Sequence, residues 1–391
     1  MAIEIQQCEP GKSVADFVRA GFEVFRHDPA WVPPLSVVFK EKLTPSRDPF
    51  YEHAEVALFT ARRGGRLVGR VSASVDHAWL DYWKDATGHF GYFDTVNDAD
   101  VAHALLERAE RWLRARGITR VSGPMSFSAS QEVGLLVDGF DSPPSVDMPH
   151  SRRHQAALVE GCGYVKEKDL FAWHYDIQRP FNARTLKAWE TITALPEVKL
   201  RTVERKHLRQ EIATIMAIYN ETWAGKWGYV PITAPELDKM AKDLSIVIDP
   251  DIAFIADVHG EPAGMCISVP NLNEAIADLN GSLLPMGWAK LLWRVKVAHP
   301  VTMRLILLGV RERYRRNVKR YGALSTAMYV ECAKRSLAKG YRSAELGWTR
   351  EDDAPINLGI RSMGGRVYKT YRVYEKMLGP RAAAATGAAG E

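Results

Sequence analysis

Apolar residues in this chain gather in short runs separated by polar turns, and one arrangement of these runs occurs twice. In each copy, an apolar run is followed by a turn that contains glycine and then by a second apolar run, over residues 56–75 and 252–269. Four residues of the first copy recur at a constant offset of 195 positions: Phe59, Ala61, Gly65 and Gly69 correspond to Phe254, Ala256, Gly260 and Gly264. Two apolar runs joined by a short glycine turn predict an antiparallel β-hairpin. The recurrence of this hairpin predicts two similar domains.

The elements around the two hairpins follow one order in both halves of the chain. In the first half the pattern predicts strands at residues 3–7, 89–95, 120–123 and 170–177, and helices at residues 13–26, 98–116 and 155–161. In the second half it predicts strands at residues 199–204, 303–310, 343–348 and 366–377, and helices at residues 209–224, 234–244 and 323–339. The apolar positions of the 98–116 segment follow helical spacing, with Asp98 as a candidate N-cap and Gly117 as the stop. This mixture predicts an α/β fold with a mixed sheet.

The chain divides most naturally near Arg179 and Pro180. We therefore expect domains at residues 1–179 and 180–379, followed by a disordered alanine-rich tail at residues 380–391. A length of 391 residues with 46% hydrophobic and 25% charged residues suits two globular domains. No apolar stretch reaches the roughly 20 residues of a membrane span, and the first residues lack the layout of a signal peptide. We expect a cytoplasmic protein.

Charge is concentrated in one segment of the second half. Six basic residues fall between Arg311 and Arg320, directly after a predicted strand and before a predicted helix. Exposed backbone N–H groups and the positive end of a helix dipole attract phosphate at such a place. The candidate phosphate-binding residues are Val310, Tyr314, Arg315, Arg316, Lys319 and Gly322. A solvent-exposed basic turn, or a patch that touches anionic phospholipid, is the alternative interpretation.

The order of helix, hairpin, strand, helix, strand, helix and strand resembles the Gcn5-related N-acetyltransferase (GNAT) fold, in which the loop before the central helix holds the coenzyme A pyrophosphate. Residues 309–324 are similar to the family's V-x-P-x-Y-R-x-x-G-x-G-x-x-L loop in position, in Tyr314-Arg315 and in the closing Gly322-Ala323-Leu324. The segment lacks the first glycine of the pair and is slightly longer. In the first half, residues 88–94 run into their helix without a basic glycine loop. The resemblance therefore implies a first domain that lacks the coenzyme A loop and shapes the acceptor cleft.

A closer resemblance covers nearly the whole chain. Its segments are HDPAWVPPL from His27, GHFGYFD from Gly88, GPMSFSASQEVGLLVDGF from Gly123, YNETWAGKWGYVPIT from Tyr219, VPNLN from Val269, GVRERYRRN from Gly309 and GGRVYKTYRVYEK from Gly364. Together they are similar to a bacterial tandem GNAT group that includes the bacterial ceramide synthases. The resemblance implies a long-chain acyl-CoA as co-substrate, no tightly bound cofactor, and a lipidic amine as acceptor. The implied reaction is direct acylation of sphinganine or 3-oxosphinganine to give a (dihydro)ceramide.

Direct acyl transfer needs a neutral amine, donors for the thioester oxygen and a proton for the departing thiolate. Many GNAT enzymes supply that proton from a Tyr in the last helix, but the corresponding position here is Ile360. Tyr368, Tyr371 and Tyr374 lie close by, and any of them could substitute; core packing is the alternative for each.

The candidate general bases lie in the first half of the chain. Glu132 lies in a loop rich in Gly, Ser and Pro, and turn capping is its alternative role. His89 and Asp94 flank an aromatic strand that we expect to face the cleft between the domains, and a structural role is the alternative for each.

Five further residues are candidates for contact with the substrate: Asn220, Trp223, Trp227, Tyr229 and Asn273. For the aromatic residues the alternative is core packing, and for the two asparagines it is turn formation. Residues 283–296 combine Leu, Trp and Met with Lys and Arg, the composition of an interfacial helix. We therefore expect peripheral contact with the cytoplasmic face of the inner membrane through this segment. A helix that simply covers the core is the alternative.

Three other functions compete with lipid N-acylation. They are an acetyl-CoA-dependent acetyltransferase for small amines or amino acids, an aminoacyl transferase of the Fem type, and a non-catalytic protein that binds coenzyme A or lipid. The Fem type usually carries a coiled helical arm, which the sequence does not predict. Because HExxH, GxSxG, P-loop and paired CxxC motifs are absent, we expect no metal site and neither hydrolase nor nuclease activity. No nucleic-acid partner is expected, and the sequence makes no prediction of oligomeric state.

Overall fold

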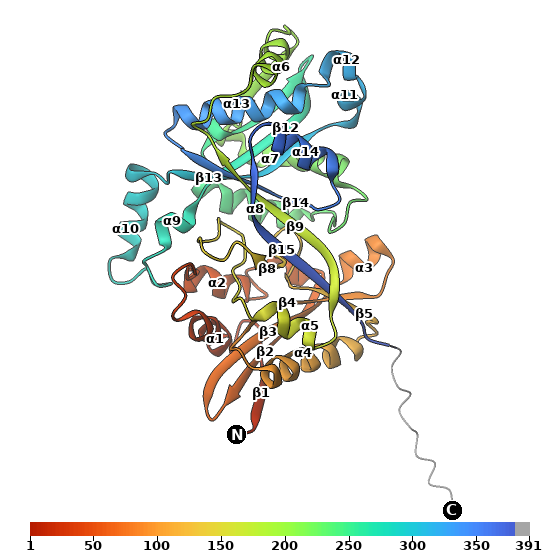
Figure 1. The fold of residues 1–391 in the computed structure, drawn as a ribbon, viewed down its shortest axis with the longest axis vertical. Helices are drawn as coiled ribbons and strands as arrows, with labels where there is room; N and C mark the ends of the chain where they lie inside the picture. Colours follow the sequence, from red (N-terminus) through yellow and green to blue (C-terminus); the bar gives the residue numbers. More distant parts are fainter. Residues whose placement is uncertain (380–391) are drawn as a thin grey trace, which may run out of the picture.

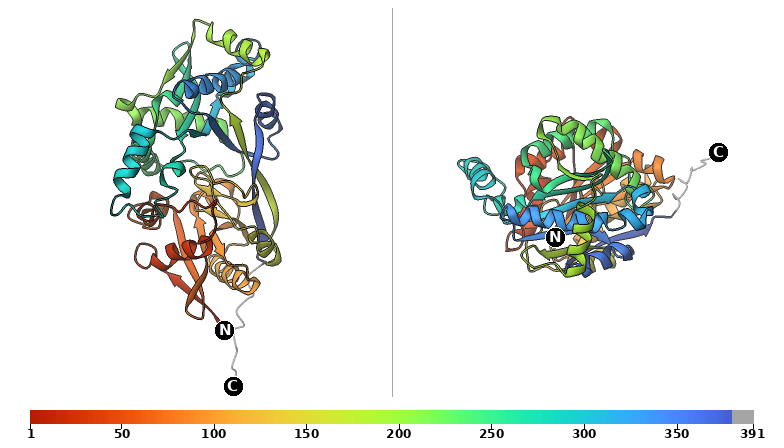
Figure 2. Two further views of the ribbon diagram at one scale, coloured as in Figure 1. Left: turned by 60° about the vertical axis from the view of Figure 1, so that its left-hand side comes forward. Right: turned by 90° about the horizontal axis from the view of Figure 1, so that it is seen from above.

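One mixed sheet runs through both halves of the molecule, and helices cover both of its faces (Figure 1, Figure 2). The computed structural model describes residues 1–379, so the predicted disordered tail lies outside the described residues. The strands pair in the order β1-β2-β3-β4-β5-β15-β9-β14-β13-β12-β11-β10, with β8 beside β15, and β6 and β7 form a separate small hairpin. The mixed α/β fold with two similar halves is confirmed.

The strands of the first half are β1 Ile3–Cys8, β2 Ala54–Arg63, β3 Arg66–Asp76, β4 Thr87–Thr95, β5 Arg120–Gly123, β6 Met125–Ser126, β7 Glu132–Val133, β8 Leu135–Asp138 and β9 Val165–Asp176. Those of the second half are β10 Val198–Thr202, β11 Ala253–Val258, β12 Glu261–Pro270, β13 Thr302–Val310, β14 Ser343–Arg350 and β15 Arg366–Met377.

The helices of the first half are α1 Ala15–Phe25, α2 Ser36–Lys42, α3 His77–Trp83, α4 Ala99–Arg114 and α5 Gln155–Gly161. Those of the second half are α6 Ala183–Thr193, α7 Leu208–Trp223, α8 Ala234–Val247, α9 Leu272–Ile276, α10 Gly287–Trp293, α11 Glu312–Arg316, α12 Val318–Tyr321, α13 Leu324–Ala338 and α14 Ala354–Ser362. A π-helical turn, Arg294–Ala298, continues α10, and short 3-10 turns occupy Pro49–Glu52, Arg205–His207 and Pro250–Ile252. The pattern did not predict α2, α3, α6 or the two short helices α11 and α12.

The repeated hairpin is reproduced down to its strand register. Ala61 pairs with Gly69 in the first copy, Ala256 pairs with Gly264 in the second, and in both hairpins the register shifts directly after that alanine. The residues that close the hairpins, Asp76 and its counterpart Asn271, each become the N-cap of the next helix. The repeat is therefore present in the structure as well as in the sequence.

The last strands of the two halves are exchanged. β9, from the first half, pairs with β14 of the second half, whereas β15, at the end of the second half, pairs with β5 and β8 of the first. The exchanged strands also pair antiparallel with each other and run side by side through the middle of the molecule (Figure 1). The division at residues 179 and 180 stays a prediction, and β15 crosses it.

The two halves differ where the central parallel strands separate. In the first half, parallel pairing of β4 with β5 ends at His89 and Ser122, and the space beyond is filled by the chain itself. The backbone N–H of Tyr92 donates to Ser126 Oγ at 3.1 Å, and all of β4 is buried. A Cβ atom on Gly91 would lie 2.2 Å from the carbonyl oxygen of Met125. The opening between β4 and β5, where these parallel strands separate, is therefore closed.

The corresponding opening in the second half is less buried, and we call it the free opening. Parallel pairing of β13 with β14 ends at Leu305 and Leu346. Beyond that pair, residues 306–308 of β13 are half-buried, although residues 303–305 are buried. This copy therefore keeps a half-buried strand edge beside a separating partner, where a ligand can lie between the strands.

A single methyl group should test how tightly the first opening is filled. We expect Gly91→Ala to lower the free energy of unfolding by about 1–3 kcal/mol, since the added Cβ overlaps the backbone of Met125. Gly161→Ala is the matched control: its Cβ meets no atom within 4 Å, and this glycine does not have a positive φ. Chemical denaturation of both variants measures the difference; equal stabilities would mean that the first opening is not closed.

A charged contact also joins the halves. His53 Nδ1 lies 2.9 Å from Asp76 Oδ1, and its Nε2 lies 3.3 Å from Glu236 Oε1 on α8. Hydrogen bonds to these two carboxylates, Asp76 first, raise the pKa of His53 to about 10. Glu236 also completes the capping box of α8 with Thr233. The contact therefore depends on a protonated histidine.

This contact gives a pH dependence with a defined sign. Because the pKa of His53 is raised from 6.5 to about 10, its stabilisation is fully present below pH 6.5 and is lost as the pH rises toward 10. We expect His53→Gln to remove about 1–2 kcal/mol of this pH-dependent stability after allowance for solvent screening. Urea unfolding at several pH values measures it; parallel profiles for the variant and the native protein would contradict the assignment.

Candidate active site

Aromatic side chains surround the free opening between β13 and β14. The ring of Trp223, at the end of α7, lies beside Gly309, where an added Cβ would meet it at 2.8 Å. The rings of Trp227 and Trp348 are 6.2 Å apart. Lys226 lies 5.2 Å from the Trp223 ring, and burial lowers its pKa. The opening therefore has apolar walls with a basic group nearby.

The basic segment lies between this opening and α13. Val310 ends β13 and is buried. Arg315 and Arg316 on α11, Lys319 on α12 and Gly322 directly after α12 are exposed. Tyr314 packs edge-on against Tyr321, with ring centroids 5.6 Å apart. No side chain caps the N-terminus of α13. The structure thus brings the six candidate phosphate-binding residues into one segment before a 15-residue helix.

Asn220, Trp223, Trp227 and Tyr229 lie at the contact between the halves. The Tyr229 hydroxyl donates to Asn220 Oδ1 at 2.9 Å, and Trp223 stacks on Tyr219. Trp227 donates from Nε1 to Glu167 Oε1 at 2.7 Å. The fifth candidate substrate residue, Asn273, lies elsewhere, in the wall of a large cavity.

This cavity, of about 330 Å³, is lined by both halves of the chain. One part of its wall is apolar and consists of Trp31, Val32, Pro34, Leu35, Val38, Leu272, Ile276 and Leu291. The other part is polar and consists of Lys42, Arg70, Asp94, Ser126, Glu132, Asp147, His150, Ser151 and Asn273. The size and the mixed apolar and polar lining suit a molecule with an apolar chain and a polar group.

Glu132 and Asp94 meet in this cavity, but their surroundings differ. Arg70 donates from Nε to Asp94 Oδ2 at 2.7 Å, and its second nitrogen lies 2.6 Å from the same oxygen. This pairing neutralises Asp94 and occupies its carboxylate. Burial raises the pKa of Glu132, an effect that the charge of Lys42 opposes. Of the two carboxylates, Glu132 is the one suited to accept a proton.

The sequence did not single out four titratable residues of this site: Lys42, Asp147, Asp28 and His150. Lys42 and Asp147 line the cavity, and both act on the charge of Glu132. His150 Nε2 lies 3.1 Å from Asp28 Oδ2, and burial lowers the pKa of His150. Asp28 belongs to the HDPAWVPPL segment, and the resemblance of that segment to the family could have identified Asp28 as a candidate site residue. Lys42 ends a helix that the Pro-rich sequence did not predict.

Helix α9 closes the cavity from the second half. Asn273 donates from Nδ2 to the carbonyl oxygens of Pro144 and Ser145 at 3.0 and 3.1 Å. The backbone N–H of Ser36 donates to the carbonyl oxygen of Gly281 at 2.8 Å. A Cβ atom on Gly281 would lie 2.6 Å from the Phe22 ring, so the two segments touch closely.

Arg304 connects the cavity to the free opening. It donates to the carbonyl oxygen of Val146 at 2.8 Å and to that of Gly347 at 3.2 Å. Val146 lines the cavity, and Gly347 is the first residue beyond the last parallel pair of β14. Arg304 also pairs with the buried Glu345 at 3.1 Å. The cavity wall and the opening therefore share one side chain.

Three more catalytic candidates lie outside the cavity wall: His89, Tyr371 and Tyr374. His89 is buried against the Trp79 ring at 4.7 Å, and burial lowers its pKa. Tyr374 is buried and donates to Glu160 Oε1 at 3.0 Å. Burial also holds the pKa of Tyr371 well above its usual range. The structure does not bring these three residues together with Glu132.

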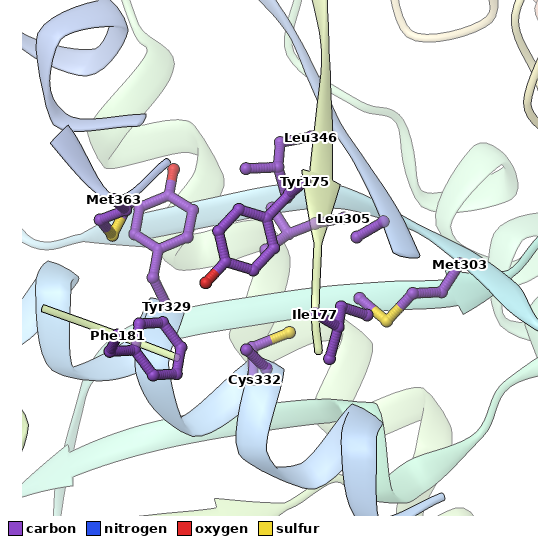
Figure 3. A pocket seen from close by; sticks show the side chains of 11 residues that line it. Tyr175, Ile177, Phe181, Met303, Leu305, Tyr329, Cys332, Leu346 and Met363 are labelled. Atoms are coloured by element: carbon purple, nitrogen blue, oxygen red, sulfur yellow. The ribbon is translucent and has the colours of Figure 1, made fainter. Parts of the chain in front are cut away.

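A second, much smaller cavity lies between β13, β14 and α13, on an entirely apolar wall (Figure 3). Figure 3 shows Tyr175, Tyr329 and Cys332 among its lining side chains. Its volume is about 20 Å³, close to that of one water molecule. A long chain cannot fit there without displacing side chains, whereas the larger cavity has the necessary room.

Two searches of residues 1–379 gave negative results. No group of three or more His, Cys, Asp and Glu residues there is placed to hold a metal ion. Within the same residues, no helix has the length and apolar character to cross a membrane.

Comparison with known proteins gives relatives along almost the full length of the chain. It is 40% identical over 353 residues to the bacterial ceramide synthase of Caulobacter vibrioides, covering 90% of this chain and 91% of that protein. It is 36% identical over 366 residues to protein YghO of Escherichia coli, covering 93% and 92%. No family model matches the chain.

Solved structures share the fold at low identity. A tandem GNAT protein from the clavulanic acid biosynthesis pathway matches with a TM-score of 0.58 and 14% identity, over 97% of this chain and 100% of that one. A GCN5-related N-acetyltransferase from Sphaerobacter thermophilus matches with a TM-score of 0.52 and 14% identity, over 96% of both chains. The chain therefore belongs to the family of the bacterial ceramide synthase, and it is an N-acyltransferase with a tandem GNAT fold.

Proposed function

We propose that the protein transfers the acyl group of a long-chain acyl-CoA to the amine of a sphingoid base, sphinganine or 3-oxosphinganine, to give a (dihydro)ceramide. The observation that carries this proposal is the cavity of about 330 Å³, which has an apolar wall and a carboxylate at its polar end. Such a cavity suits a long-chain amine. The name of the Caulobacter vibrioides relative supports the same acceptor.

In this proposal each half of the molecule binds one of the two substrates. Residues 180–379 take the acyl-CoA, with the thioester in the free opening between β13 and β14. Arg315, Arg316 and Lys319 would bind its phosphates through charge, and the exposed backbone near Gly322 would add N–H donors at the start of α13. Residues 1–179 take the amine, because Glu132 and most of the cavity wall belong to them.

The chemistry needs one proton acceptor and one set of backbone donors. Glu132 removes a proton from the ammonium group, and the neutral nitrogen attacks the thioester carbonyl. Backbone N–H groups on the free edge of β13 stabilise the oxyanion. As the C–N bond forms, the C–S bond breaks, and the second proton from nitrogen passes to the thiolate. Tyr371 and Tyr374 are buried, so either can carry that proton only if the packing around it opens toward the thiolate.

Product mass spectrometry tests the proposal. The purified protein would receive palmitoyl-CoA or acetyl-CoA together with sphinganine, 3-oxosphinganine or a panel of small amines. We expect an N-palmitoyl sphingoid product and no product from acetyl-CoA with small amines. Acetylated small amines would instead identify a small-amine acetyltransferase, and binding of coenzyme A without any product would identify a binding protein.

The role of Glu132 can be tested by an isosteric change. We expect Glu132→Gln to lower kcat by about 100-fold or more, because general-base catalysis contributes at least that much. The KM for acyl-CoA should change little. In the native protein kcat/KM should rise with pH through the raised pKa of Glu132, and this limb should vanish in the variant. The control is Glu261→Gln, at an exposed residue of β12. An unchanged kcat in the Glu132→Gln variant would exclude Glu132 as the base.

The basic segment can be tested separately from the chemistry. We expect the double substitution of Arg315 and Arg316 by Ala to raise the KM for acyl-CoA by about 10-fold or more, since each charged contact to phosphate is worth about 1.5–3 kcal/mol. The kcat at saturation should stay near the native value. Arg184→Ala, at an exposed residue of α6, is the control. A KM equal to that of the control would move the phosphate site elsewhere.

A further inference from the structure

Exposed apolar side chains concentrate on one side of the molecule. Of the seventeen large apolar residues that are exposed among residues 1–379, eight come from two short segments: Val37, Val38, Leu284, Met286, Trp288, Leu292, Trp293 and Val297. We call these eight residues the docking surface. Trp288 is 56% exposed and Trp293 is 57% exposed. Both segments, α2 and α10 with its π-helical turn, lie on the same side of the molecule (Figure 1, Figure 2).

Cations outnumber carboxylates around this surface. Residues 279–301 contain Lys290, Arg294 and Lys296 and no acidic residue. Asp278, just before this segment, is paired with Lys290 and Arg294, and α2 carries one exposed carboxylate, Glu41, between Lys40 and Lys42. Apolar and aromatic side chains interspersed with cations are the composition that binds the interface of an anionic bilayer. A soluble acidic partner would match the charge but not the two exposed tryptophans.

The docking surface is continuous with the large cavity. Val38 belongs to the cavity wall and is also 47% exposed, so the cavity reaches the surface there. Leu291 lines the cavity from α10, and the next residue, Leu292, is 54% exposed. Apolar residues of the cavity wall therefore adjoin the docking surface.

We propose that the docking surface binds an anionic phospholipid bilayer and that the long-chain amine passes directly from the bilayer into the cavity between Val38 and Leu291. This inference rests on the proposed function, because it concerns the same acceptor. Each methylene that leaves a bilayer for water costs free energy, so a path that stays apolar removes most of that cost. Once in the cavity, the amine has its apolar chain toward the docking surface and its nitrogen near Glu132.

Docking is tested by sedimentation of the full-length protein with vesicles. The vesicles contain phosphatidylcholine alone or phosphatidylcholine with phosphatidylglycerol. We expect binding to the anionic vesicles that weakens with salt, and a loss of about tenfold or more in the double variant Leu292→Glu and Trp293→Glu. Ile246→Glu is the matched control, since Ile246 is 65% exposed on α8, outside the docking surface.

Two results would overturn the docking step. One is binding of the double variant as strong as that of the Ile246→Glu control. The other is a native protein that forms a stable dimer without vesicles and that the double variant makes monomeric, because the surface would then be a contact between copies of this chain. Circular dichroism of each variant checks that it is folded.

The path into the cavity is tested with the variant Leu291→Trp, which enlarges a side chain of the cavity wall outside the docking surface without changing charge. The probe is sphinganine held in anionic vesicles, and its transfer to the protein is measured without acyl-CoA. We expect vesicle binding to persist while sphinganine transfer falls by about tenfold or more. Unchanged transfer would overturn the path.

The same measurements separate this inference from the proposed function. Transfer of sphinganine without formation of any amide would keep the docking surface and the path but remove the proposed reaction. Amide formation from detergent-dispersed sphinganine, together with no vesicle binding, would keep the reaction and overturn the docking surface.

Discussion

The exchange of terminal strands is the constraint on which the rest of the molecule depends. Because β15 completes the sheet of the first half and β9 completes that of the second, every strand of the main sheet is part of one hydrogen-bonded ladder. The relative position of the halves is therefore fixed by backbone hydrogen bonds and not only by side-chain packing. A cavity lined by both halves can keep its shape only under such a constraint.

Within this rigid frame, duplication has produced two different openings. The first opening is filled by residues 125 and 126, and the second remains free beside residues 306–308. The first half supplies Glu132 and most of the cavity wall. Arg304 lies between the cavity and the free opening and contacts both. In the proposed reaction, the two copies carry complementary parts of one site.

Local patterns predicted local structure well. The offset of 195 positions identified both hairpins, and Asp98 was confirmed as the N-cap of α4. Sequence also placed Glu132 and Asp94 among the site candidates, and both line the cavity. The exchange of β9 and β15 could not be predicted, because their pairing joins residues about 200 positions apart and no local pattern identifies so distant a partner. The pairing of His150 with Asp28 escaped notice for the same reason.

The contact at Gly281 has a consequence for how this protein can change over evolutionary time. The loop before α10 is held by a backbone hydrogen bond from Ser36, at a glycine where no side chain fits. Since neither partner in that bond is a side chain, the outward residues of α10 can vary without loosening the bond. The exposed face of α10 can therefore diversify while the loop before it keeps its place beside Phe22.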